Sequence, residues 1–231
     1  MAGVAVLAVV LSLRTGSRMG LIAMGVRLLV AMVVMRGRAR LCLMVGTPVA
    51  AFVVLTFLPQ EMQERYQTMV SDNDVVESDD IAAAVASTEG RWQLLLKSLE
   101  VTARHPVFGA GPGNFSNTDA AKQGYSASHN AYTQMSSECG IAGGAMFAGL
   151  VLYCLGRANQ LRKVARQVPA WRAYYLMALC LLLSGVAYSV CAVFGSVAYG
   201  IHRPVLAGLV LSLERAFARL SVSETGPTPH A

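Results

Sequence analysis

Apolar residues gather in long runs with few charges, and polar residues gather between them. A helix needs about 20 mostly apolar residues to cross roughly 30 Å of bilayer hydrocarbon. The runs that reach or approach this length are Met19 to Met35, Leu41 to Leu58, Cys139 to Gly156, Trp171 to Val193 and a last run from Pro204. The pattern predicts an all-α fold, a polytopic membrane helix bundle of about five to six spans with a large, partly helical loop.

The chain opens inside a shorter apolar run, Met1 to Leu13. This run has neither the charged front nor the cleavage site of a signal peptide. It is also too short to span a bilayer. We therefore expect the sequence to lack its natural N-terminal part.

The distribution of charge orients the predicted spans. Basic residues follow the first and third long runs, as Arg36, Arg38 and Arg40 and then as Arg157, Arg162, Lys163 and Arg166. Such clusters are typical of the cytoplasmic side, whereas acidic residues crowd the segment between the two groups of spans. We expect transmembrane helices over 1–58, an outer loop over 59–138, transmembrane helices over 139–219 and a disordered cytoplasmic tail over 220–231.

Composition narrows the function classes. Hydrophobic residues make up 55% of the 231 residues and charged residues 14%, which is not the composition of a water-soluble globule. The net charge of +6 comes from clusters that flank apolar runs, so no nucleic-acid partner is expected. The five cysteines show no C-x-x-C spacing and are interpreted as small core residues rather than zinc ligands or disulfides.

The outer loop holds the candidate chemistry. Thr88 can cap a helix that would place Arg91 near the positive N-terminal end, where an anion could be held. The helix should stop at His105-Pro106, because a residue before proline avoids helical angles. The run Gly109 to Gly113 then predicts a tight turn. Its amides could bind a phosphate, but a bare alternation of glycines favours a purely structural turn.

Four short motifs follow one another along the chain. Thr15 to Gly20 is a Ser-Arg turn before a span, Arg91 to Leu95 is R-x-x-x-L, His105 to Gly111 is H-P-V-F-G-A-G, and His129 to Gly143 is H-N-x9-G-x-x-G. In this order they resemble the O-antigen ligase and polymerase superfamily of bacterial envelope glycosyltransferases. The resemblance covers roughly Leu7 to Leu213 and corresponds to the C-terminal half of that family's many-span core.

The resemblance implies a GT-C-like fold in the bacterial inner membrane, with the active loop facing the periplasm. It implies a metal-independent, inverting transfer of a glycan from an undecaprenyl-pyrophosphate carrier to an acceptor hydroxyl. The expected partners are this lipid-linked glycan, a lipid A-core or other glycan acceptor, and membrane lipid. No cofactor and no metal are expected, and the acidic stretch Ser71 to Asp80 is interpreted as a solvated connector.

The resemblance also assigns roles to single residues. His129 is the expected base, because an imidazole can take a proton from a sugar hydroxyl as that hydroxyl attacks the anomeric carbon. Arginines are expected to hold the pyrophosphate by forked hydrogen bonds. Arg91 is the first candidate for this role, followed by Arg18 and Arg14.

Each assignment has a simpler alternative. His129 could be an interfacial hydrogen-bonding residue, Arg91 a solvated helix residue, and the two upstream arginines ordinary flanking charges. Asn130 and Glu138 are expected to support the site. Glu138 would either pair with an arginine or support His129.

Three further functions remain open at this point. Two are of the same class: a polymerase that extends the glycan on its own carrier, and a protein O-oligosaccharyltransferase. The third is a transporter or an inactive truncated scaffold, which would use Arg27 inside a span and would have no need of His129.

Overall fold

The computed structural model describes residues 18–56, 79–118 and 128–224, and every regular element in these ranges is a helix. The chain divides into two compact units, residues 1–97 and residues 98–231. The all-α prediction is therefore confirmed for the described residues. Arg14 and the acidic stretch from Ser71 to Glu77 lie outside them.

The first unit contains the two N-terminal apolar runs as helices. Helix α2 covers Arg18–Val34 and α3 covers Arg38–Thr56, and the two helices contact each other. Gly37 joins them with a φ of 64°, a left-handed conformation that glycine adopts without steric cost. The basic cluster expected at this connection is exposed.

Helix α5 runs from the first unit into the second and covers Asp79–Arg104. Its end before His105-Pro106 confirms the predicted stop. Its start does not agree with the predicted cap at Thr88, because the helix begins nine residues earlier. The alanine-rich stretch before Thr88 favours helix, so Arg91 lies in the middle of α5 and not near its positive end.

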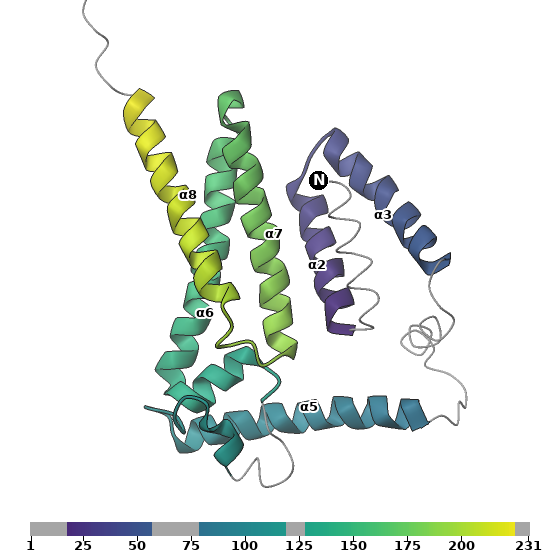
Figure 1. Ribbon diagram of the computed structural model, residues 1–231, viewed down its shortest axis with the longest axis vertical. Helices are drawn as coiled ribbons and strands as arrows, with labels where there is room; N and C mark the ends of the chain where they lie inside the picture. Colours follow the sequence, from purple (N-terminus) through teal and green to yellow (C-terminus); the bar gives the residue numbers. More distant parts are fainter. Residues whose placement is uncertain (1–17, 57–78, 119–127, 225–231) are drawn as a thin grey trace, which may run out of the picture. The chain divides into compact units, whose positions relative to one another are not determined.

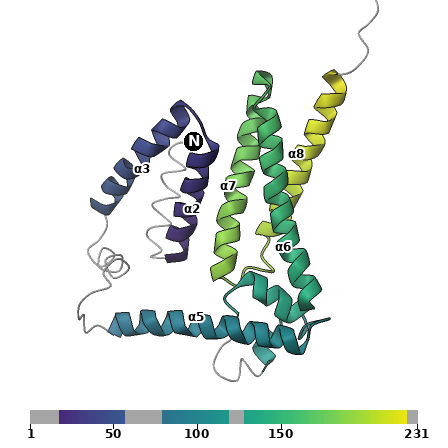
Figure 2. The ribbon, with the colours of Figure 1, turned by 180° about the vertical axis from the view of Figure 1, so that it is seen from behind.

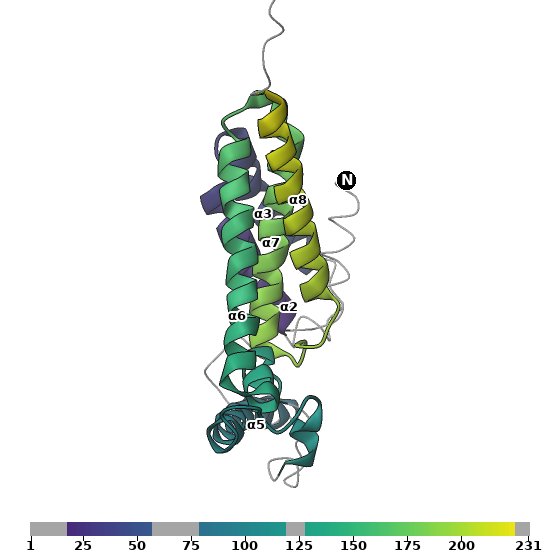
Figure 3. The same cartoon turned by 90° about the vertical axis from the view of Figure 1, so that its left-hand side faces the viewer.

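The second unit is built on three long helices. Helices α6 (Ala131–Ala165), α7 (Arg172–Phe194) and α8 (His202–Glu224) pack side by side (Figure 1, Figure 3). Short 3-10 turns cover Asn114–Asn117 (η1) and Pro169–Trp171 (η3). Among the described residues, Ala131–Ala165 and Pro169–Phe194 are long and apolar enough to cross a membrane. The predicted count of five to six spans stays a prediction.

Contacts between the helices hold this three-helix group together at its middle and at one end. Gly185 of α7 permits a close approach, since a Cβ there would lie 2.8 Å from a methyl group of Leu155 on α6. At the far end, Trp171 and Tyr174 pack edge-on against Phe217 of α8, with ring centres 5.3 Å and 5.4 Å apart. An ion pair of Arg157 with Glu214 also joins α6 to α8.

The cysteines only partly follow the expectation of a core. All five are free, and Cys154 is buried on α6. Cys42 and Cys180 are exposed, so the expectation is wrong for these two.

Helix α6 reverses direction at Gly140, as the turn near its N-terminal end shows from both sides (Figure 1, Figure 2). Gly140 has φ 75° and ψ 178°, a region that essentially only glycine adopts. Ala131 and Phe147 belong to one buried cluster, although in a straight helix they would be about 24 Å apart. The segment Ala131 to Cys139 therefore folds back along the segment that follows Gly140.

Two more glycines make room for this reversal. A Cβ on Gly144 would lie 2.8 Å from Cβ of Ser136, and one on Gly143 would overlap Cβ of Cys139. By contrast, Gly149 has open space around the position of a Cβ. Gly143 and Gly144 therefore allow two parts of α6 to lie against each other.

Gly140→Ala should lower the free energy of unfolding by about 1–3 kcal/mol or more, because alanine is strained in this conformation. Its Cβ would also overlap the carbonyl of Val107. The matched control is Gly149→Ala, which lies in a regular part of α6 and should leave stability unchanged or slightly raised. Thermal unfolding midpoints in detergent measure both, and equal midpoints would contradict the reversal.

Candidate functional site

His129 lies directly before α6 with its side chain exposed. Its φ of 48° is uncommon for a residue with a side chain, and histidine is one of the types enriched there. Its backbone N–H donates to Oγ of Ser196, at 3.0 Å, in the connection between α7 and α8. In the described part of the chain its imidazole has no hydrogen-bond partner. The backbone is thus held while the ring stays accessible.

Asn130 caps the helix that follows His129. Its Oδ1 accepts from the backbone N–H of Tyr132 at 2.9 Å and from that of Thr133 at 3.1 Å. These amides belong to the first turn of α6 and have no partner within the helix. Asn130 is therefore the N-cap of α6, and it fixes the backbone that directly follows His129.

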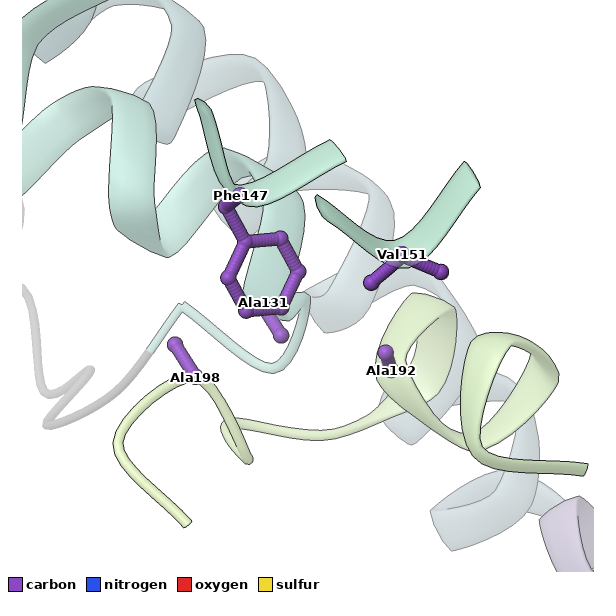
Figure 4. Close-up of a cluster of buried hydrophobic side chains, with 5 residues drawn as sticks. All are labelled: Ala131, Phe147, Val151, Ala192 and Ala198. Carbon is purple, nitrogen blue, oxygen red and sulfur yellow. The ribbon is translucent and has the colours of Figure 1, made fainter. Parts of the chain in front are cut away.

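A buried apolar cluster holds the same region in place. Ala131, Phe147 and Val151 of α6 pack with Ala192 of α7 and Ala198 of the α7–α8 connection (Figure 4). The ring of Tyr132 adds an edge-on contact to Phe147, with centres 5.2 Å apart. His129 is consequently positioned at the end of the bundle where α7 ends and α8 begins.

The glycine-rich turn after α5 uses its amides within the protein. Gly109 donates to the carbonyl of His105, Ala110 to that of Ser137, and Gly111 to that of Glu138, at 2.8–3.0 Å. The amide of Gly113 donates to Oε2 of Glu138 at 2.8 Å. Asn114 N donates to Gly111 O at 3.1 Å, and Pro112 has no amide hydrogen. The structural interpretation of this turn is confirmed, and the phosphate-binding alternative is wrong.

The turn and the reversal in α6 fit against each other with almost no space between the backbones. Ile141 N donates to the carbonyl of Pro106 at 2.9 Å, which closes the contact from the other side of Gly140. A Cβ on Gly109 would overlap the backbone of Glu138, and one on Gly140 would overlap that of Val107. The H-P-V-F-G-A-G and H-N-x9-G-x-x-G motifs are therefore two halves of one backbone interface.

Glu138 is buried, with 2% of its surface exposed, inside this interface. Its Oε2 accepts from the hydroxyl of Tyr199 at 2.5 Å as well as from Gly113. Burial, followed by the bond to Glu138, raises the pKa of Tyr199, so its hydroxyl stays a donor at physiological pH. Among the described residues Glu138 pairs with no arginine and does not contact His129. Glu138 instead joins the turn, α6 and the α7–α8 connection to one another.

The predicted arginines belong to the first unit of the chain. Arg91 is exposed on α5 within the first unit. Arg18 is the first residue of α2, and its side chain, like the whole of Arg14, is outside the described residues. His129, Asn130 and Glu138 all belong to the second unit, whereas Arg91, Arg18 and Arg14 belong to the first.

Three residues, two in the α7–α8 connection and one at the start of α8, were missed by sequence reasoning. Ser196 and Tyr199 bind the backbone of His129 and the side chain of Glu138, and Arg203 places its guanidinium over the ring of Phe147. Their only signal in the sequence is that a short turn between two spans must lie at the same end as the segment before α6.

In residues 18–56, 79–118 and 128–224, no group of three His, Cys, Asp or Glu side chains could hold a metal ion. The triplet Asp72-Asn73-Asp74 has the D-x-D spacing of a metal-binding carboxylate pair and lies outside these ranges.

Comparison with known proteins places these residues in a family. The family model described as O-antigen ligase matches residues 3–148, more than half of the chain, and includes His129, Asn130 and Glu138. No curated protein and no solved structure matches the chain. The family supports a role as an envelope glycosyltransferase of the ligase or polymerase type, acting on glycan and lipid-linked substrates. With its two long apolar helices, the chain is a membrane protein that belongs to the O-antigen ligase family.

Proposed function

We propose that this protein transfers a glycan from an undecaprenyl-pyrophosphate carrier to a hydroxyl of lipid A-core or another envelope acceptor. His129 is the general base. The observation that carries the proposal is the setting of His129: its backbone is fixed by Asn130 and Ser196, and its imidazole is exposed and unengaged among the described residues. A base needs this combination of fixed position and access.

The reaction is a displacement at the anomeric carbon. The acceptor oxygen forms a bond to that carbon while the bond to the pyrophosphate oxygen breaks, and the leaving group keeps the electron pair. The proton of the acceptor hydroxyl passes to the imidazole of His129. Attack opposite the leaving group inverts the configuration at the carbon.

The level of His129 along the helices suits a donor that is anchored in lipid. Helix α7 ends at Phe194 and α8 begins at His202, so the connection bonded to His129 marks one end of the apolar helices. The headgroup of a polyprenyl carrier lies at such a membrane surface. Because Arg162, Lys163 and Arg166 lie at the other end of α6, we assign the His129 end to the periplasmic face of the inner membrane.

The leaving pyrophosphate carries negative charge that increases as the bond breaks. Arginine side chains neutralise such a group through two parallel N–H···O bonds. Arg91, with Arg18 and Arg14 behind it, is proposed for this task in the first unit. If guanidinium groups neutralise the leaving pyrophosphate, the reaction needs no metal ion for that purpose.

His129→Ala should lower turnover by about 10²- to 10⁴-fold, because a general base acts mainly in the transition state. Binding of the lipid-linked donor should remain. The measurement is a transfer assay in the full-length setting with a chelator present and absent, together with donor binding. Wild-type turnover in His129→Ala would contradict the proposal, and a strict need for added divalent metal would contradict its leaving-group part.

Substitutions at two other positions serve as controls for this assay. His105→Ala replaces another exposed histidine, and transfer should stay near the wild-type rate. Asn130→Asp keeps a side-chain oxygen that can cap α6, whereas Asn130→Ala removes it at a cost of about 0.5–2 kcal/mol. If the role of Asn130 is the cap, Asp should restore both stability and transfer.

The orientation is tested with single cysteines in a cysteine-free background. Asn117→Cys, at the exposed end of η1, should react with a membrane-impermeant maleimide in intact cells. Lys163→Cys, exposed near the end of α6, should react only after the inner membrane is permeabilised. The reverse pattern would place His129 on the cytoplasmic side and remove the proposed reaction.

A further inference from the structure

Arg203 is the second residue of α8 and lies at the same end of the second unit as His129. Its guanidinium carbon is 4.8 Å from the centre of the Phe147 ring. Phe147 is buried, with 1% of its surface exposed, and packs in the cluster that contains Ala131, two residues after His129. The guanidinium is therefore held on the support that positions the proposed base.

The charge of Arg203 is not neutralised by a carboxylate in the described part of the chain. The ion pairs there join Glu100 with Arg104 and Arg157 with Glu214. Glu138, the buried acid of the site, instead accepts hydrogen bonds from Tyr199 and Gly113. A partly buried cation at the same end of the second unit as the exposed His129 is thus left without a carboxylate partner among the described residues.

Stacking on an aromatic ring suits a guanidinium that binds an anion. The ring attracts the cation through its π face and restricts its movement. It takes none of the five N–H donors, which point outward in the plane of the group and match the oxygens of a phosphate. The positive-inside preference does not explain the charge of Arg203, because that preference applies to the cytoplasmic side and Arg203 lies at the end assigned to the periplasm.

We infer that Arg203 binds the pyrophosphate of the membrane-anchored donor next to His129. The inference rests on the proposed function and deepens it. Arg203 would neutralise the charge that develops on the leaving oxygen while His129 accepts the proton from the acceptor hydroxyl. Unlike Arg91, it belongs to the same unit as His129, and it lies outside the stretch that the family model matches.

Equilibrium binding to the detergent-solubilised full chain tests this assignment with three probes. Undecaprenyl pyrophosphate carries both chain and anion, undecaprenol carries only the chain, and phosphatidylglycerol is an ordinary anionic lipid. Arg203→Gln should raise the Kd for undecaprenyl pyrophosphate about 10- to 100-fold, as expected for charge-assisted hydrogen bonds. The Kd values for undecaprenol and phosphatidylglycerol should not change.

Arg203→Lys separates binding from packing. Lysine keeps the charge and can still lie over Phe147, but it lacks the planar fork, so the Kd for undecaprenyl pyrophosphate should still rise several-fold. If Arg203→Gln fails to fold, this variant decides. The matched control is Arg172→Gln, an exposed arginine at the start of α7 and so at the opposite end, which should bind all three probes like the wild type.

An unchanged Kd for undecaprenyl pyrophosphate in a folded Arg203→Gln or Arg203→Lys protein would overturn the assignment. An equal loss for undecaprenol would also overturn it, because the effect would then be structural. A loss confined to phosphatidylglycerol would assign Arg203 to bulk lipid. Failure of the proposed function is a separate result. In that case the wild type would transfer no glycan, or His129→Ala would keep wild-type turnover, whatever Kd values the Arg203 variants show.

Discussion

The second unit depends on the contact between the turn after α5 and the reversal in α6. Three amides of the turn donate to Ser137 and Glu138, and Ile141 donates back to Pro106. These bonds satisfy backbone groups that the interrupted helix would otherwise leave without partners. The same contact requires two backbones to approach so closely that only glycine fits at Gly109 and Gly140.

This constraint gives a physical meaning to the spacing H-N-x9-G-x-x-G. Asn130 starts a helix, and nine residues make about two and a half turns. Gly140 then reverses the chain, and Gly143 leaves space for the returning segment. Each position other than His129 has a task in building the fold, whereas the His129 ring makes no hydrogen bond within the described residues. The motif is therefore a scaffold that presents one side chain.

Local signals in the sequence predicted the parts of this arrangement that depend on near neighbours. Pro106 ended α5, and the glycines after it formed a structural turn, because both effects act within a few residues. The start of α5 was misplaced because Thr88 resembles a cap, although the alanines before it continue the helix. The reversal at Gly140 was missed because glycines in an apolar run are also typical of packing between helices.

The site itself was only half predictable, for a related reason. His129, Asn130 and Glu138 are marked by a motif, but the residues that complete their surroundings lie about 60 to 70 positions away, as the contacts of Ser196 and Tyr199 show. No local periodicity connects a short turn between two helices with a segment so far upstream. Only the packing of α6 against α7 and α8 joins them.

The same packing determines which partners the polar side chains at this end of the bundle have. Glu138 is buried, yet its charge is balanced by two hydrogen-bond donors rather than by a cation. Because Tyr199 remains protonated, it can serve continuously as one of these donors. The carboxylate therefore does not need Arg203, whose guanidinium rests on Phe147 instead. Among the described residues, the imidazole of His129 and the guanidinium of Arg203 are thus both left available for the proposed displacement of pyrophosphate by a hydroxyl.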